Sequence, residues 1–294
     1  MSDIFCSVLS QQLNEPIIGT AGRGDIWLLL EYNESWAAKA TQENGLPRPV
    51  QAHLDAFLAV TPHSRLQFIR QSGRRGDLAF FVAVLTGERP TLYRFDLANY
   101  EALLTLDLGV VAAGRYEQAK TDQSLLLVCT NGKRDRCCAL YGLALYQALT
   151  EMGGAAVWQT THLGGHRFAP TLVSLPDGYV YGRVAPAGAN QLWAAHQGCE
   201  LWLDHLRGRA CYDGPTQAAE ILLRQHTGRV APDDFRWLAT EKGENGQWLV
   251  RFVDPAGQLH PVHLCQETLP TPIQVSCGKP QTENPTRYWL NPSA

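Results

Sequence analysis

The sequence lacks the charge balance and the long apolar runs of two large functional classes. Its 25 lysines and arginines stand against 28 aspartates and glutamates, so the formal net charge is −3. Binding to nucleic acid requires an excess of basic side chains to neutralise phosphates, so we expect no nucleic-acid partner. No apolar run reaches the roughly 18 residues of a membrane span, and no basic segment leads into an apolar one at the start. We therefore expect no membrane association and a cytoplasmic location.

Cysteine is scarce and irregularly spaced. Eight cysteines in 294 residues do not form the dense framework of a disulfide-linked secreted domain. In a reducing compartment, clustered cysteines indicate metal or redox chemistry. No Cys-x-x-Cys opens a helix, which argues against a dithiol enzyme of thioredoxin type that uses Cys137 and Cys138. Five other cysteines are expected to be small buried or unreactive residues rather than a second site: Cys6, Cys199, Cys211, Cys265 and Cys277.

The first half of the chain shows an α/β pattern. With 45% hydrophobic residues, the chain can bury a sizeable core. The short apolar run 26–30 is typical of a strand buried on both faces, and residues 49–60 have apolar side chains at helical spacing. A second strand is expected at 66–69. Residues 78–85 and 91–95 then flank a turn and predict a hairpin.

The second half repeats this order of elements. A strand is predicted at 124–128, a helix at 139–150 and another strand at 155–158. Residues 171–175 and 179–184 predict a hairpin that turns at a Pro-Asp-Gly sequence.

A shift of 98 residues roughly aligns the two halves. In that register, Glu31 and Ala40 occupy the places of Cys129 and Cys138. Residues 26–95 therefore look like a degenerate duplicate that lacks the thiols.

The rest of the chain predicts a small α+β region. We expect a helical segment at 191–206, a helix at 217–225, and a hairpin formed by 248–253 and 258–264. The polar, proline-rich stretch 270–294 is expected to be an extended strap. The predicted domains are a degenerate unit, a unit with the thiols and a C-terminal α+β region, over residues 1–112, 113–210 and 211–294.

Two cysteines and two histidines follow predicted strand ends. Cys129 directly follows the predicted strand 124–128, and Cys138 opens the next helix. The α/β folds often bind ligands at this place, between the end of a strand and the start of a helix. His162 and His166 flank Leu-Gly-Gly just after another strand, so the two loops can meet at one sheet edge. Two thiolates and two imidazoles suit either tetrahedral zinc or a [2Fe-2S] cluster, and ligand type alone leaves both open.

Three ordered sequence runs resemble the sucrase/ferredoxin-like family. They are the Cys129 to Cys138 run, the His162-Leu-Gly-Gly-His166 run with Arg-Phe-Ala-Pro after it, and Leu-Pro-Asp-Gly-Tyr-Val-Tyr-Gly-Arg at 175–183. The resemblance is strong over about residues 120–185. Residues 15–21 and 276–279 resemble the family's flanks more loosely.

This resemblance implies a thioredoxin-like fold, which we expect in both units, and a [2Fe-2S] cluster. The implied ligands are Cys129, Cys138, His162 and His166, in the bis-histidinyl arrangement, with zinc as the alternative occupant. Two ferric ions, two sulfides and two thiolates sum to zero charge, so reduction is easier than in an all-cysteine cluster. Such a protein is expected to be an electron carrier rather than a catalyst, and exposed histidine ligands that lose a proton would couple electron transfer to proton transfer.

A redox partner protein is the expected partner. Four basic residues near the ligand loops could dock an acidic one: Lys133, Arg134, Arg136 and Arg167. Cys137 is a rival ligand, but neighbouring side chains generally point in different directions, and the family spacing selects Cys138.

Overall fold

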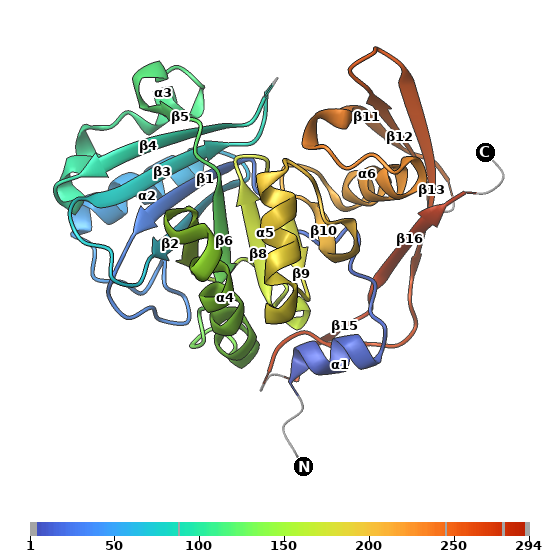
Figure 1. Ribbon diagram of the computed structural model, residues 1–294, viewed down its shortest axis with the longest axis horizontal. Helices are drawn as coiled ribbons and strands as arrows, with labels where there is room; N and C mark the ends of the chain where they lie inside the picture. The colour runs from blue at the N-terminus through green and yellow to red at the C-terminus, as the bar shows by residue number, and fades with distance from the viewer. Residues whose placement is uncertain (1–4, 88, 245, 278–279, 292–294) are drawn as a thin grey trace.

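One large mixed sheet organises most of the molecule (Figure 1). The computed structural model describes residues 5–87, 89–244, 246–277 and 280–291. The strand order in this sheet is β10-β9-β8-β6-β7-β2-β1-β3-β4-β5. Its strands in chain order are β1 (Ile26–Glu31), β2 (Ser64–Arg70), β3 (Leu78–Val84), β4 (Thr91–Leu97), β5 (Lys120–Thr121), β6 (Leu125–Cys129), β7 (Val157–Thr160), β8 (Thr171–Leu175), β9 (Tyr179–Gly182) and β10 (Leu206–Arg209).

The first unit is a β-α-β-β-β arrangement. β1 pairs in parallel with β2, and helix α2 (Arg48–Val60) connects them. β1 also pairs antiparallel with β3, which forms a hairpin with β4. The strand order 2-1-3-4 is thioredoxin-like. The predicted strands, helix and hairpin of this half are confirmed within a few residues at their ends. The shorter elements η1 (Tyr100–Thr105), α3 (Leu108–Ala112) and η2 (Glu117–Ala119) follow.

The second unit has the same strand order. β6 pairs in parallel with β7 and antiparallel with β8, which continues into a hairpin with β9. The crossover runs through the π-helical turn η3 (Cys138–Gly142), helix α4 (Leu143–Gly153) and η4 (Gly154–Ala156). The fold is therefore mixed α/β and thioredoxin-like, as predicted. The duplication itself and the predicted domain boundaries stay predictions.

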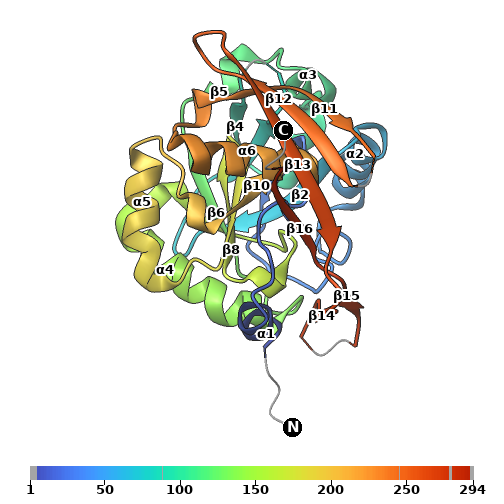
Figure 2. The ribbon, with the colours of Figure 1, turned by 90° about the vertical axis from the view of Figure 1, so that its right-hand side faces the viewer.

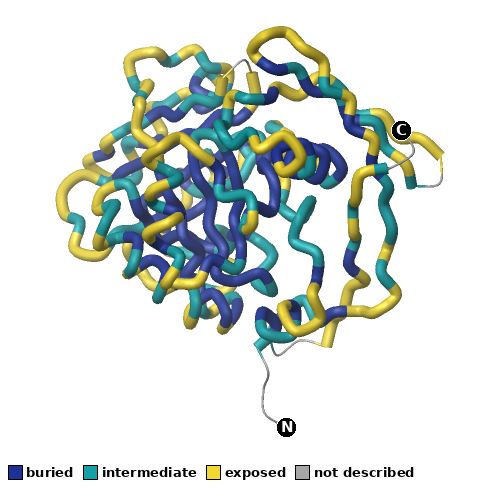
Figure 3. Tube along the Cα trace, turned by 45° about the vertical axis from the view of Figure 1, so that its right-hand side comes forward, coloured by how far each residue is buried: buried dark blue, intermediate teal, exposed yellow. Residues whose placement is uncertain are grey.

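An antiparallel contact joins the two units into one sheet. Ile69 and Arg70 of β2 pair with Thr160 and Gln159 of β7. On one face of the sheet, a single apolar cluster contains residues from both units, among them Phe81 of the first and Trp158 of the second. Burial is concentrated in the central strands, as Figure 3 shows.

The prediction of one helical segment over 191–206 is wrong in its second half. Helix α5 covers only Ala189–Gln197 and ends at Gly198, and a 3₁₀ turn η7 (Leu203–His205) leads into β10. Leu206 to Arg209 are buried because β10 adds to the edge strand β9. Two further 3₁₀ turns, η5 (His166–Phe168) and η6 (Pro186–Gly188), lie between β7 and α5.

The C-terminal region is a helix packed on a four-stranded sheet. Helix α6 (Gly214–Thr227) ends at Gly228, which adopts a left-handed conformation, as the sequence predicts. The sheet order is β11-β12-β13-β16. The predicted hairpin is confirmed as β12 (Gln247–Val253) and β13 (Leu259–Thr268), whereas β11 (Arg236–Lys242), after the turn η8 (Pro232–Asp234), was not expected.

The prediction of a simple extended strap at 270–294 is also wrong in part. Within its described residues lie β14 (Ile273–Gln274), β15 (Thr282–Glu283) and β16 (Thr286–Leu290), and β16 pairs with β13. The chain's first helix α1 (Cys6–Gln12) lies beside β14 and β15, as the lower part of Figure 2 shows. Among the described residues, no helix is long and apolar enough to span a membrane.

Candidate metal centre

Cys129 and Cys138 are placed by the start of the second crossover. Cys129 is the last residue of β6, and Cys138 opens the π-helical turn η3. Both side chains are 1% exposed and belong to the same apolar cluster. A π-helical turn widens the backbone locally and is often found at functional sites. The two predicted cysteines therefore lie in one buried place at the carboxyl edge of β6.

His162 and His166 lie on a loop after β7 that the half-buried Arg65 and the buried Arg207 hold. Arg65 Nη2 donates to the carbonyl of Leu163 at 2.9 Å, and Arg207 Nη1 donates to that of Gly164 at 3.0 Å. The two glycines between the histidines have φ of +100° and +70°. Residues with a Cβ rarely adopt such values, so the glycines allow the sharp turn.

The structure brings the four predicted ligands together as a chain of contacts. One ligand atom each from Cys129, Cys138 and His162 lies within 4.8 Å of the others. His166 is outside that group of three, but its Nδ1 is 3.4 Å from Nε2 of His162. The prediction that the cysteine loop and the histidine loop meet is confirmed.

The donor set fits a metal or an iron–sulfur group. Nitrogen ligands about 2.0–2.1 Å from one tetrahedral metal lie roughly 3.3–3.4 Å apart, which is the observed spacing of the two rings. Nδ1 of His162 and Nε2 of His166 are buried and have no hydrogen-bond partner among the described residues. Buried polar atoms without a partner are costly, so these rings have unmet bonding capacity.

The two thiols ionise one after the other. A hydrogen bond from Cys138 lowers the pKa of Cys129 well below its usual value, against the effect of burial, and His162 adds to the lowering. The same interaction, together with burial, raises the pKa of Cys138 well above its usual value. One thiolate therefore forms readily, and a bound cation is needed for both to be ionised.

Asp135 lies between the candidate centre and a second group of cysteines, which consists of Cys6, Cys137 and Cys277. Burial opposes its ionisation, but the backbone N–H groups of Cys137 and Cys277 outweigh burial and hold the pKa of the carboxyl below its usual range. Its Oδ2 is 3.5 Å from Nε2 of His166, although the geometry is not that of a hydrogen bond. Burial lowers the pKa of His166, so the ring is neutral near pH 7, as a metal ligand must be.

Comparison with known families is consistent with this site. The sucrase/ferredoxin-like family matches residues 17–208, which is more than half of the chain. The chain belongs to the sucrase/ferredoxin-like family.

One curated relative and two solved structures are similar to parts of the chain. The chain is 30% identical over 122 residues to Altered inheritance of mitochondria protein 32 of Meyerozyma guilliermondii, covering 37% of this chain and 42% of that protein. The chain thus matches less than half of this curated relative. The wild-type thioredoxin-like [2Fe-2S] ferredoxin of Aquifex aeolicus is 20% identical, with a TM-score of 0.27, over 29% of this chain and 97% of that one. Its Cys59Ser variant gives 21% identity and a TM-score of 0.26, covering 28% and 96%.

The sequence alone did not identify several residues that surround the candidate metal centre. Arg65 and Arg207 come from β2 and β10, and no local signal links them to the histidine loop. Cys6 and Cys277 were expected to be small buried or unreactive residues, and no sequence signal indicated that both of their sulfurs contact that of Cys137. Only their contact in three dimensions, between segments far apart in the sequence, shows this.

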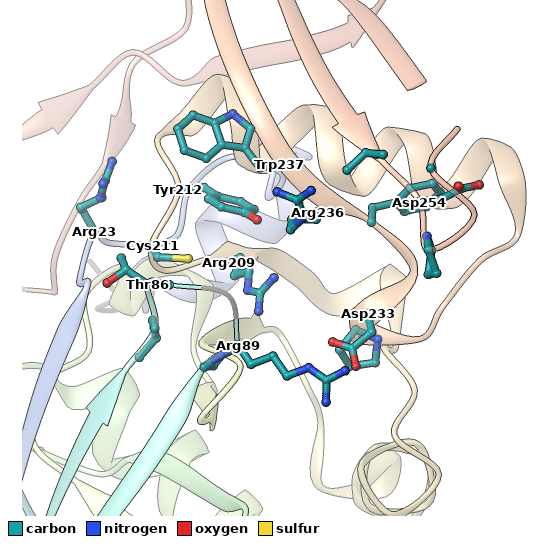
Figure 4. Close-up of a pocket in the computed structure, with 18 residues that line it drawn as sticks. Arg23, Thr86, Arg89, Arg209, Cys211, Tyr212, Asp233, Arg236, Trp237 and Asp254 are labelled. Atoms are coloured by element: carbon teal, nitrogen blue, oxygen red, sulfur yellow. The ribbon is translucent and has the colours of Figure 1, made fainter. Parts of the chain in front are cut away.

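Two hollows lie near the sheet. One of about 350 Å³ is lined by His162, Arg134 and Asn131 together with residues 38–42, and gives access to the candidate centre. The other, of about 630 Å³, contains none of the four predicted ligands. Figure 4 shows its labelled residues, which include Arg89, Arg209, Arg236, Asp233 and Asp254.

Proposed function

We propose that this chain binds a [2Fe-2S] cluster through Cys129, Cys138, His162 and His166 and acts as a one-electron carrier. The observation that carries the proposal is the 3.4 Å contact between the two imidazole nitrogens, beside two buried cysteines. When bound, the cluster supplies a centre that gains or loses a single electron. The membership of the family supports this assignment of the ligands.

The surrounding residues keep the ligands in place. Arg65 and Arg207 fix two carbonyls of the histidine loop, which limits the movement of both rings. Burial lowers the pKa of Arg65 to about 10 and that of Arg207 to about 9, so both remain cationic at pH 7. Two positive charges beside the centre favour its more negative, reduced form.

One ring nitrogen of the site faces a carboxylate. Nε2 of His166 is 3.5 Å from Oδ2 of Asp135, whose low pKa keeps it ionised, so a proton that this nitrogen loses passes on to solvent. A histidine ligand whose second nitrogen faces a carboxylate is a common arrangement at metal sites. We propose that this pair accounts for any coupling of electron transfer to proton transfer.

Electrons enter through the hollow beside His162. Arg134 lines this hollow, and Lys133 next to it is exposed. We propose that Lys133, Arg134 and Arg136 dock an acidic redox partner protein in the cytoplasm. Arg167 contributes less, because its Nε donates to the buried carboxylate of Glu15 at 2.6 Å.

Metal and sulfide analysis tests the proposal directly. We expect about two iron ions and two acid-labile sulfides per chain, with a red-brown colour. A colourless protein with zinc bound to Cys129 and Cys138 would instead support the alternative zinc-binding module. A dithiol enzyme has less support, because Cys137 and Cys138 belong to different apolar clusters.

Histidine-to-cysteine variants test the ligand assignment. His162→Cys and His166→Cys should keep the cluster and lower its reduction potential, because a thiolate adds negative charge to the oxidised state. His205→Cys is a matched control outside the site and should leave the potential unchanged. An unchanged potential in the first two variants would show that these histidines are not ligands.

A further inference from the structure

Three cysteines and one aspartate meet at a second place in the molecule. Cys6 lies at the start of α1, Cys137 directly precedes η3, and Cys277 follows β14. The Sγ–Sγ distances are 3.5 Å for Cys6 and Cys137, 3.3 Å for Cys137 and Cys277, and 3.6 Å for Cys6 and Cys277. Both carboxylate oxygens of Asp135 are 4.0 Å from the sulfur of Cys6.

The three sulfurs form a nearly regular triangle. Thiolates about 2.3 Å from a tetrahedral zinc ion lie roughly 3.8 Å apart, so small shifts would suffice for all three to contact one ion. One ligand atom from each of the four residues lies within 4.8 Å of the others. Cys6 and Cys137 are fully buried and Cys277 is partly buried, so the place is shielded but has an entry.

Asp135 is held in position by other groups and still has a free binding direction. It accepts hydrogen bonds from the backbone N–H of Cys137 at 2.9 Å and from that of Cys277 at 2.9 Å. The hydroxyl of Ser276 donates a third at 3.0 Å. A carboxylate has about four lone-pair sites, so one remains for a metal ion.

A single cation satisfies all four groups, whereas a disulfide does not. A disulfide between any two of the cysteines would leave the third sulfur beside a buried carboxylate. Thiolate sulfur selects zinc and other soft metals. Cys137 belongs to an apolar cluster with Cys6, while Cys138 belongs to the one with Cys129, so the two places use different sulfurs.

We propose that Cys6, Cys137, Cys277 and Asp135 bind one zinc ion. Binding releases to solvent the protons that Cys6 and Cys277 carry, whereas Cys137, with a pKa lowered to about 6 chiefly by a hydrogen bond from Cys6, is already largely ionised near pH 7. The ion links the first helix and the C-terminal segment to the loop between Cys129 and Cys138. This proposal uses none of the four ligands proposed for the iron–sulfur cluster and shares with that centre only Asp135, which faces His166.

Metal analysis of the full-length protein, produced with zinc in the medium, tests the site. We expect about one zinc ion per chain in the wild type and at least a five-fold loss in Cys6→Ser and Cys277→Ser. Iron content and the visible spectrum should stay the same in both variants. Cys199→Ser and Cys265→Ser are matched controls that should keep the zinc.

Cobalt provides a second readout that does not require a variant to fold. Exchange of zinc for Co²⁺ in the wild-type protein should produce thiolate-to-cobalt absorption in the near ultraviolet and the visible bands of tetrahedral cobalt. Zinc absent from the wild type, or a disulfide detected between two of the three cysteines by mass, would overturn the proposal. Zinc that is lost in Cys129→Ser but kept in Cys277→Ser would also overturn it, and would contradict the iron–sulfur assignment as well.

Discussion

Gly142 leaves space for the end of the strand that carries Cys129. A Cβ built on Gly142 would lie 2.0 Å from the carbonyl oxygen of Cys129. Its φ of −68° is ordinary for a helix, so the glycine is required for space and not for conformation. The close approach of the π-helical turn to the strand end therefore depends on the missing side chain.

We predict that Gly142→Ala disturbs the centre. Alanine improves helix propensity by about 1 kcal/mol, whereas overpacking typically costs about 1–3 kcal/mol and the contact here is with backbone that cannot rotate away. The cost should exceed the gain, so cluster content falls and the midpoint of chemical denaturation decreases. Iron analysis and denaturation measure the two effects.

Gly243→Ala is the control for this change. A Cβ at Gly243 would meet its nearest atom at 3.5 Å, an ordinary contact, so stability and iron content should stay at the wild-type values. Equal iron content in the two variants would show that the approach of η3 to β6 does not position the ligands.

The sequence predicts individual residues well where the signal is local. Cys129, Cys138, His162 and His166 could be identified as candidate ligands because they follow predicted strand ends or open the next helix, within short spacings. Cys6 and Cys277 could not, because their partner Cys137 is more than 130 residues away in each direction.

The equivalent position in the first unit is filled by an ion pair. Glu31 ends β1 as Cys129 ends β6, and its carboxylate contacts Arg74, which lies in the loop after β2. It also accepts a hydrogen bond from the backbone N–H of Ala79 at 2.8 Å. The same place in the topology thus holds a partly buried charge pair in one unit and the candidate metal centre in the other, in line with the absence of thiols from the first unit.

Elements with clear periodicity were predicted, and elements that depend on distant pairing were not. The strands β1, β3 and β6 have continuous apolar runs, so their sequence alone identifies them. β11 is largely exposed, and β16 is short, so neither has a clear pattern. Both exist because they pair with β12 and β13.

The loop between β6 and η3 should control access by charged redox reagents. We predict that Lys133→Glu/Arg134→Glu slows oxidation of the reduced protein by hexacyanoferrate(III), an anion, by about 3- to 10-fold at low salt. Oxidation by the hexaamminecobalt(III) cation should become faster. Stopped-flow absorbance measures both rates, and added salt should reduce both differences.

Arg115→Glu/Lys120→Glu changes the net charge by the same amount at the β5 edge of the sheet and serves as the control. It should change both rates much less. Equal effects of the two double variants would mean that net charge, and not the loop beside His162, governs the approach of partners.

At the scale of the whole molecule, the two thioredoxin-like units share a core. Phe81 of the first unit contacts Trp158 of the second edge to face, with ring centroids 5.8 Å apart. Across the same junction, the hydroxyl of Thr161 accepts a hydrogen bond from the backbone N–H of Phe68 at 3.1 Å and donates one to Oε1 of Gln67 at 2.8 Å. The sequence predicted two units in order, but their pairing through β2 and β7 could not be predicted, since neither edge has a distinctive sequence.

This shared core predicts that residues 113–294 do not fold alone, although the sequence suggests a boundary at residue 112. Without the first unit, β7 loses the neighbouring strand β2, and each large apolar side chain left exposed costs about 1.5–3 kcal/mol. The fragment 113–294 should aggregate or show no cooperative thermal transition by circular dichroism. Mixing it during refolding with residues 1–112 should restore a soluble complex that takes up iron and sulfide, because only one peptide bond is then missing. A fragment 113–294 that unfolds cooperatively and binds the cluster by itself would show instead that the second unit is an independent domain.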